Sequence, residues 1–289
     1  MSDVSIPAGV GRCWWTFALW MLGCTLISTP AALVPYTVDS ATLHLWHLDE
    51  TAVPCVDSAP GGTNLTSLAN GATLGAANVS FPGFGNCLNT FDGGPSSTTQ
   101  KDALLSVVSL ASGTGDDVPL ALADPGTGAF TFEAIVRIDF NPAANLAARN
   151  SGMQIFSGEG DGTTDRIFQW RIDPVGYGSG DTSVPRLEFI NLRQGGAIQN
   201  ILLALPTNGP NVIASNQWFH VAVAYDGNDS SPDNFRAYWT ALTNTAATSA
   251  NFIGTATMVN DLSVAGCDFT IGNEGRATGG STDNFVGLL

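Results

Sequence analysis

The sequence predicts an all-β protein, a two-sheet antiparallel jelly-roll sandwich. Many short runs of residues alternate between apolar and polar with the two-residue period of a strand. Segments rich in glycine, asparagine and aspartate separate these runs, as turns do. No window shows a sustained helical period with caps, although residues 101–111 are compatible with one short helix. The absence of a long internal repeat disfavours a solenoid or a propeller.

The clearest strand covers residues 130–140, where one face carries Phe130, Phe132, Ala134, Val136 and Ile138 and the other face is largely polar. The runs 218–225 and 234–242 are predicted to form a hairpin, because the first run meets the turn dipeptide Asp226-Gly227. Short extended pieces separated by turns are expected within residues 54–90. Further strands are expected at residues 42–48, 154–157, 166–172, 186–192, 198–203, 267–273 and 284–289.

The N-terminus has the order of a secretory signal. Arg12 precedes an apolar run at residues 13–27, and small residues up to Ala32 follow it, so we expect cleavage after Ala32. The run is shorter than the roughly 20 residues that span a bilayer. The alternatives are an uncleaved membrane anchor and, less favoured, lipid attachment at Cys24. We therefore expect a signal or anchor at 1–32, one domain at 33–289, and a secreted or cell-surface protein.

Composition limits the partners. The 289 residues suffice for one large sandwich, and only 12% of them are charged. The net charge is −15 and Lys101 is the sole lysine, so the chain lacks the basic patch that nucleic acid requires. An acidic surface rich in serine, threonine, asparagine and glycine suits neutral glycans, other proteins or divalent cations. Membrane contact is expected only through the N-terminal segment.

Three cysteines, Cys55, Cys87 and Cys267, follow the signal segment. Outside the cytosol two of the three can pair. A Cys55–Cys87 disulfide is predicted, because both residues lie in the glycine- and proline-rich N-terminal loops, where a crosslink would close a flexible segment. The alternative is that all three are small buried apolar residues. Their spacing does not suggest zinc.

The sequence offers little catalytic machinery. Retaining glycosidases need two carboxylates about 5 to 5.5 Å apart, whereas Glu133 and Asp139 share a strand face six residues, roughly 20 Å, apart. Glu188 stands alone. The three histidines, His44, His47 and His220, sit in apolar strand patterns, and neither a nucleophile elbow nor a phosphate-binding loop occurs. We therefore expect that the chain is not an enzyme, with a β-glycan hydrolase as a less favoured alternative.

An ordered set of fragments spans residues 42–289: 45–50 (LWHLDE), 70–73 (NGAT), 85–92 (GNCLNTFD), 130–134 (FTFEA), 217–222 (QWFHVA) and 269–273 (FTIGN). In this order they resemble the laminin G-like group of the concanavalin A-like lectin/glucanase fold. The resemblance implies two sheets packed face to face, one of them concave, with rim loops that hold ligand or calcium. Members of the group continue after a segment like 285–289 with an acidic residue and one more strand, so the resemblance also implies a fragment of a longer protein.

Calcium is the cofactor that the resemblance suggests, since oxygen ligands abound in the loops, and its analogy points to Asp49, Asp92 and Asp283. The alternative is that these are ordinary solvated loop acids. Aromatic side chains stack on sugar rings, and Tyr177, Trp170 and Trp239 are the candidates for ligand binding. Tyr177 lies in a glycine-rich loop and is expected to be exposed.

These observations favour a non-catalytic extracellular binding or adhesion module whose partner is a glycan or an extracellular protein. The alternative is a structural spacer within a larger surface protein.

Overall fold

The computed structural model describes residues 35–69, 71–77, 84–90, 104–106, 128–139, 152–159, 166–178, 180, 182–192, 198–243, 249–262, 269–273 and 285–289. These residues belong to one compact unit, Ala31–Leu289. The other unit, Met1–Pro30, lies outside the described residues, and so does the predicted signal segment. Within the described ranges, no helix has the length and hydrophobicity needed to cross a bilayer.

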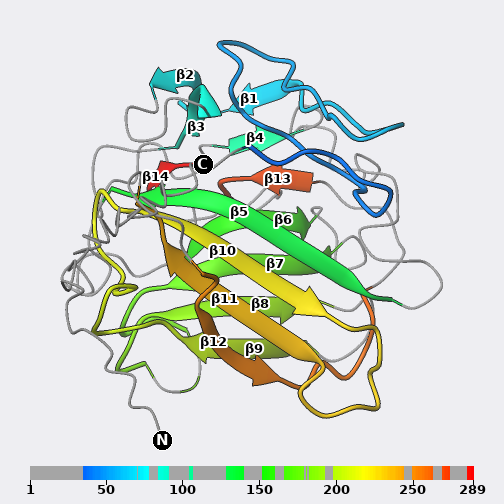
Figure 1. Ribbon diagram of the computed structural model, residues 1–289, viewed down its shortest axis with the longest axis vertical. Coiled ribbons are helices and arrows are strands. Elements are labelled where there is room, and N and C mark those ends of the chain that lie inside the picture. Colours follow the sequence, from blue (N-terminus) through cyan, green and yellow to red (C-terminus); the bar gives the residue numbers. More distant parts are fainter. Residues whose placement is uncertain are drawn as a thin grey trace, which may run out of the picture. The chain divides into compact units, whose positions relative to one another are not determined.

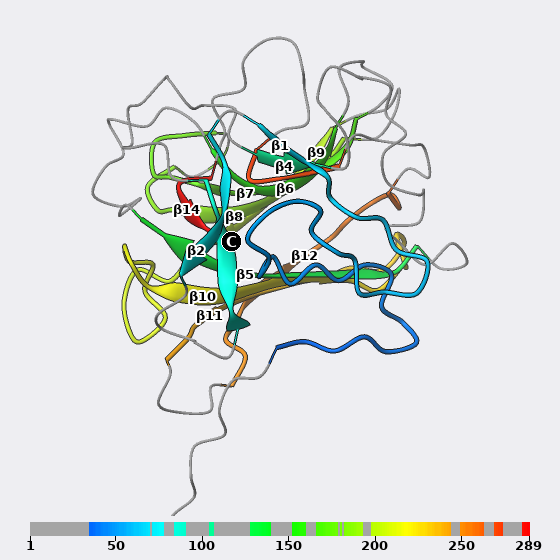
Figure 2. The same ribbon diagram turned by 90° about the horizontal axis from the view of Figure 1, so that it is seen from above.

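Two antiparallel sheets form the fold, and Figures 1 and 2 show them as two layers. The first sheet has the order β1 (Ser67–Ala69), β4 (Leu104–Ser106), β13 (Phe269–Ile271), β6 (Met153–Glu159), β7 (Arg166–Asp173), β8 (Arg186–Asn191), β9 (Gln199–Ala204). The second sheet has the order β12 (Phe252–Ala256), β11 (Phe235–Ala241), β10 (Trp218–Tyr225), β5 (Phe130–Ile138), β14 (Gly287–Leu288), β3 (Asn86–Asn89), β2 (Thr73–Ala77).

The core between the two sheets is built from alternating side chains. In β5 the even-numbered residues from Phe130 to Ile138 are buried or partly buried, as predicted. Phe132 packs against Phe168 of β7 with ring centroids 5.0 Å apart, and Phe130 packs against Phe189 of β8 at 5.5 Å. Rings that meet across the layers remove large apolar surfaces from water. The predicted fold class, an all-β two-sheet antiparallel sandwich, is confirmed.

The predicted hairpin is also confirmed. Strands β10 and β11 pair antiparallel from Phe219 opposite Ala241 to Tyr225 opposite Phe235. The loop between them is held by local bonds, since Asp226 accepts a hydrogen bond from the backbone of Asn228 at 2.9 Å. An aspartate side chain that caps its own turn is what this sequence favours.

Two local predictions were wrong. Residues 42–48 do not form a strand: Trp46 makes only an isolated bridge with Asp57, and Leu48 has a φ of 57° that a strand does not allow. The indole of Trp46 instead donates to the carbonyl of Thr63 at 2.8 Å. The short helix predicted at residues 101–111 is replaced, where the chain is described, by β4, because pairing with β1 and β13 overrides a weak local preference.

The predicted Cys55–Cys87 disulfide is not formed, because both residues are free cysteines. Cys55 belongs to the large core cluster beside Leu65, whereas Cys87 packs in a smaller cluster with Trp218. The Cys87 thiol donates to the carbonyl of Ala76 at 3.1 Å. Both therefore serve as small buried residues, the alternative that the sequence left open. Cys267 lies outside the described residues.

Both thiols should resist labelling in the folded protein. Burial raises the pKa of Cys55 to about 12 and that of Cys87 to about 11, so little of the reactive thiolate exists at neutral pH. We expect iodoacetamide to modify Cys55 and Cys87 only after denaturation, as read by peptide mass mapping. A peptide pair joined through these two residues in the non-reduced digest would show instead that the disulfide forms.

Candidate functional site

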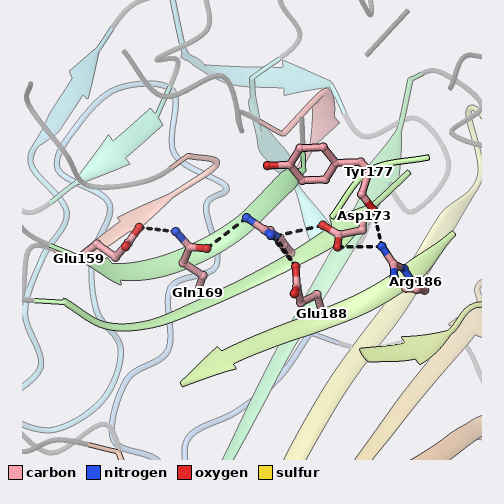
Figure 3. Close-up of polar contacts among 7 residues, drawn as sticks. Glu159, Gln169, Asp173, Tyr177, Arg186 and Glu188 are labelled. Carbon is pink, nitrogen blue, oxygen red and sulfur yellow. Dashed lines mark hydrogen bonds and ion pairs between the residues drawn. The ribbon is translucent and has the colours of Figure 1, made fainter. Parts of the chain in front are cut away.

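The face of the first sheet that points away from the core carries an unusual row of polar side chains. Gln169, Arg171 and Asp173 alternate along β7 with the core residues Phe168, Trp170 and Ile172. On β8, Glu188 stands directly opposite Arg171, and Arg186 opposite Asp173. We call the following set the polar row: Gln154, Glu159, Gln169, Arg171, Asp173, Arg186 and Glu188. Figure 3 draws the members of the polar row other than Gln154, together with Tyr177.

Arg171 is the centre of the polar row. Its guanidinium lies 2.6 Å from Glu188 Oε2, through both Nε and Nη2, and 3.0 Å from Asp173 Oδ1. Its Nη1 donates to Gln169 at 3.2 Å, and Gln169 in turn donates to Glu159 at 2.7 Å. A planar guanidinium supplies several donors in fixed directions, so it fixes both carboxylates.

Arg186 closes the other end of the row. Its guanidinium donates to Asp173 Oδ2 at 3.3 Å and also to the backbone carbonyl of Tyr177. The Tyr177 ring lies 5.3 Å from the guanidinium carbon of Arg171, a cation–π contact. Two arginines and an aromatic ring thus frame Asp173 (Figure 3).

The polar row is buried, although it lies on the face opposite the core. Glu159, Asp173 and Glu188 have 0% exposure, and Arg171 has 8%. Charged side chains are almost never buried at this level unless they are paired, since removing an ion from water is costly. Burying several charged side chains on one sheet face is therefore costly for stability. Because such costs are typical of functional sites, this row is the candidate site.

Asp173 and Glu188 act as a coupled pair. With both groups ionised, Asp173 Oδ1 and Glu188 Oε1 would lack a hydrogen-bond donor. Burial raises the pKa of Asp173 to about 8, and the charge of Glu188 and a hydrogen bond between the two carboxyl groups raise it too, against the pull of Arg171 and Arg186. At neutral pH Asp173 therefore keeps its proton, which supplies the missing donor.

This proton makes stability depend on pH in a defined direction. Between pH about 4 and about 8 the folded chain keeps a proton on Asp173 that the unfolded chain releases. The free energy of unfolding should therefore fall as the pH rises through this window, with Arg171, Arg186 and Glu188 as the charged groups facing Asp173. Urea denaturation at several pH values measures this slope. Asp173→Asn mimics the protonated acid and should flatten the profile, whereas an unchanged slope in this variant would contradict the assignment.

Gln154 extends the polar row onto β6. It pairs in register with Arg171, so the two side chains lie on the same face of the sheet, about one strand spacing apart. Its exposure is 0%, and neither its amide nitrogen nor its amide oxygen has a hydrogen-bond partner. Buried polar atoms are nearly always paired, so this amide stands out.

The predicted aromatic ligand site does not assemble. Trp170 and Trp239 are both 0% exposed, and they lie in the core on β7 and β11, where Trp239 stacks on Phe219 at 4.5 Å. Their assignment to surface stacking is wrong, because the face of each strand that carries them packs between the sheets. Tyr177 is half-buried and borders the polar row, so it alone of the three stands where a ligand could reach it.

The predicted calcium ligands are tested only in small part. Asp92 and Asp283 lie outside the described residues. The backbone carbonyl of Asp49 accepts a hydrogen bond from Asn86 at 3.0 Å. In the ranges that the structure describes, no three histidine, cysteine, aspartate or glutamate side chains are grouped to hold a metal ion. Calcium therefore stays a prediction.

The two glutamates considered for hydrolysis lie on different sheets. Glu188 belongs to the polar row, whereas Glu133 projects from the outward face of β5, where it accepts hydrogen bonds from Tyr36 at 2.6 Å and from His220 at 3.0 Å. The hydrogen bond with His220 lowers the pKa of Glu133. Since two sheets of a sandwich are about 10 Å apart, these outward-facing carboxylates do not flank one bond.

Sequence reasoning identified Tyr177, which borders the polar row, and considered Glu188 only as an isolated acid, but it missed the other members of the row. The segments RIFQWRID and RLEFIN do carry the signal, because charges of both signs alternate with apolar residues in both. Such a pattern ordinarily indicates a solvated face. The pattern does not show that this face is buried.

No protein-family model and no curated protein matches the chain. Among solved structures, it is similar to the enzymatically active domain of tailspike protein 2 from bacteriophage CBA120, with 16% identity and a TM-score of 0.38. That match covers 70% of this chain and 24% of the other. The full-length tailspike protein 2 from an Escherichia coli O157:H7 bacteriophage gives 14% identity and a TM-score of 0.37, over 70% of this chain and 22% of that one. The chain thus spans about a quarter of each.

This likeness overturns one prediction, that the chain is not an enzyme, because the similar domain is described as enzymatically active. At this identity and TM-score, the likeness does not establish an enzymatic activity for this chain.

Proposed function

We propose that this sandwich is an exported binding or adhesion module of the laminin G-like, concanavalin A-like type, and that its ligand is a glycan held at the polar row. The observation that carries the proposal is the burial of glutamates, aspartate, arginines and glutamines on the sheet face away from the core. These side chains are the hydrogen-bonding groups that fix the orientation of a polar ligand. An extracellular protein is the second partner that the sequence allows.

The solvent end of the row lies at Tyr177. Tyr177 is half-buried, and it packs on Arg171, which retains 8% exposure. An aromatic ring beside a set of hydrogen-bonding groups suits a sugar, which has an apolar ring face and polar edges. Export through residues 1–32 and an acidic surface with few charges agree with a ligand outside the cell.

A glycan array probed with the purified segment 33–289, with and without calcium, tests this function. We expect binding to at least one class of oligosaccharide. Tyr177→Ala should weaken it about two- to tenfold through loss of ring contact. Tyr238→Ala is the matched control, because Tyr238 packs on Phe252 in the second sheet and should leave binding unchanged. Flat responses in both conditions would contradict the proposal, and a dependence on calcium would support the predicted metal.

A further inference from the structure

Gln154 presents a hydrogen-bonding requirement that the described residues leave unmet. Its side chain has 0% exposure, and both ends of its amide lack partners. The cost of burying an amide without hydrogen bonds is about 1–3 kcal/mol. An apolar residue at position 154 would avoid this cost, so stability alone does not explain the glutamine.

The surroundings of Gln154 define the chemistry of its partner. The amide offers two donor hydrogens and one acceptor oxygen, and a hydroxyl group can satisfy both kinds because it donates and accepts. Arg171 is held by Glu188 and Asp173, and Arg186 is held by Asp173. An anionic ligand would therefore have to compete with protein carboxylates for both guanidinium groups, inside a chain whose net charge is −15.

We infer that Gln154 is the specificity residue of a subsite for neutral sugar hydroxyl groups on the polar row, where it lies next to Arg171 of β7. This inference rests on the proposed glycan-binding function and narrows it to uncharged polyhydroxyl ligands. A vicinal pair of hydroxyls fits best, since one oxygen can accept from the Gln154 amide nitrogen while the other donates to its amide oxygen. Uronic acids and sulfated sugars would meet the Glu188 carboxylate and guanidinium groups that protein side chains already engage, which gives selectivity against charged sugars.

The test is isothermal titration of the chain with neutral gluco-oligosaccharides and, separately, with oligogalacturonates of matched length. We expect only the neutral set to bind, and Gln154→Met to weaken that binding at least about tenfold while the free energy of unfolding stays equal or rises. Gln199→Met is the matched control. Gln199 bonds to the backbone of Thr257 at 2.6 Å and of Val259 at 3.0 Å, so its loss should lower stability and leave the affinity unchanged.

The outcomes separate the two ideas. If neither set of oligosaccharides binds the wild-type chain, the glycan-binding function fails and the subsite fails with it. If the galacturonates bind better, or if Gln154→Met binds neutral sugars as well as the wild type, only the subsite is overturned, and buried water then satisfies the amide. Should the variant not fold, the side-chain amide resonance of Gln154 in the wild-type chain answers the same question. It must shift on addition of the neutral ligand, and a static resonance under saturating ligand overturns the inference.

Discussion

Replacing Arg171 by methionine should lower the free energy of unfolding by about 3–5 kcal/mol at neutral pH. The substitution keeps most of the side-chain volume but removes the guanidinium that lies 2.6 Å from Glu188 and 3.0 Å from Asp173. Glu188 is 0% exposed, so its charge would remain buried without its closest partner. Urea denaturation followed by tryptophan fluorescence measures the loss.

Arg137→Met is the matched control for this experiment. Arg137 also pairs with a carboxylate, Asp139 at 2.8 Å, but its side chain keeps 22% exposure, and Asp139 lies only two residues along the chain, just after β5. Partly exposed pairs contribute about 1 kcal/mol or less. Equal losses of unfolding free energy in the two variants would mean that burial adds nothing to the Arg171 pairing. The polar row would then have no energetic feature that marks it as a site.

The loss of unfolding free energy caused by Arg171→Met should also become smaller at low pH. Acid strong enough to neutralise carboxylates removes the uncompensated charge, so the variant and the wild type converge as the pH falls. A volume defect alone would persist at every pH. The same urea titrations at low pH therefore separate the electrostatic cause from a packing cause.

The sequence alone was sufficient to predict the strands where one residue pattern dominated a segment. In β5, alternation of apolar residues with largely polar ones favours the one arrangement that buries Phe130 and Phe132 together. In β10 and β11, two apolar runs flank a strong turn dipeptide, so a local hairpin satisfies both at once. Local information and tertiary packing agree in these strands.

Prediction failed where a distant contact decided the outcome. The alternation of residues 42–48 looks like a strand, but Asp57 organises this segment by accepting hydrogen bonds from His44 at 2.6 Å and from the backbone of Leu45 at 2.9 Å. Alternation alone also cannot say which of two faces is the core, so it does not distinguish a buried Trp170 from one that could stack on a ligand. The burial of Glu188 was equally hidden, because Glu188 belongs to the face that alternation marks as solvated.

Gly287→Ala should be the most damaging small substitution in the described strands, with an expected loss of about 2–6 kcal/mol in the free energy of unfolding. Gly287 has a φ of 151°, which L residues rarely adopt, and an added Cβ would overlap the backbone carbonyl of Arg137. Because β14 lies between β5 and β3, a shift away from Arg137 would strain the hydrogen bonds, 2.9 Å each, that join Leu88 and Leu289.

Gly176→Ala distinguishes this clash from the backbone preference alone. Gly176 also has a positive φ, 82°, but an added Cβ there would meet no atom within 4 Å. Its expected cost is about 1–2 kcal/mol, that of holding an L residue in the left-handed region. Thermal unfolding of both variants measures the difference. If Gly287→Ala lost no more unfolding free energy than Gly176→Ala, the second sheet could open around β14 without penalty. The close packing of β14 between its two neighbours, which its register with Ile138 and Asn89 indicates, would then be wrong.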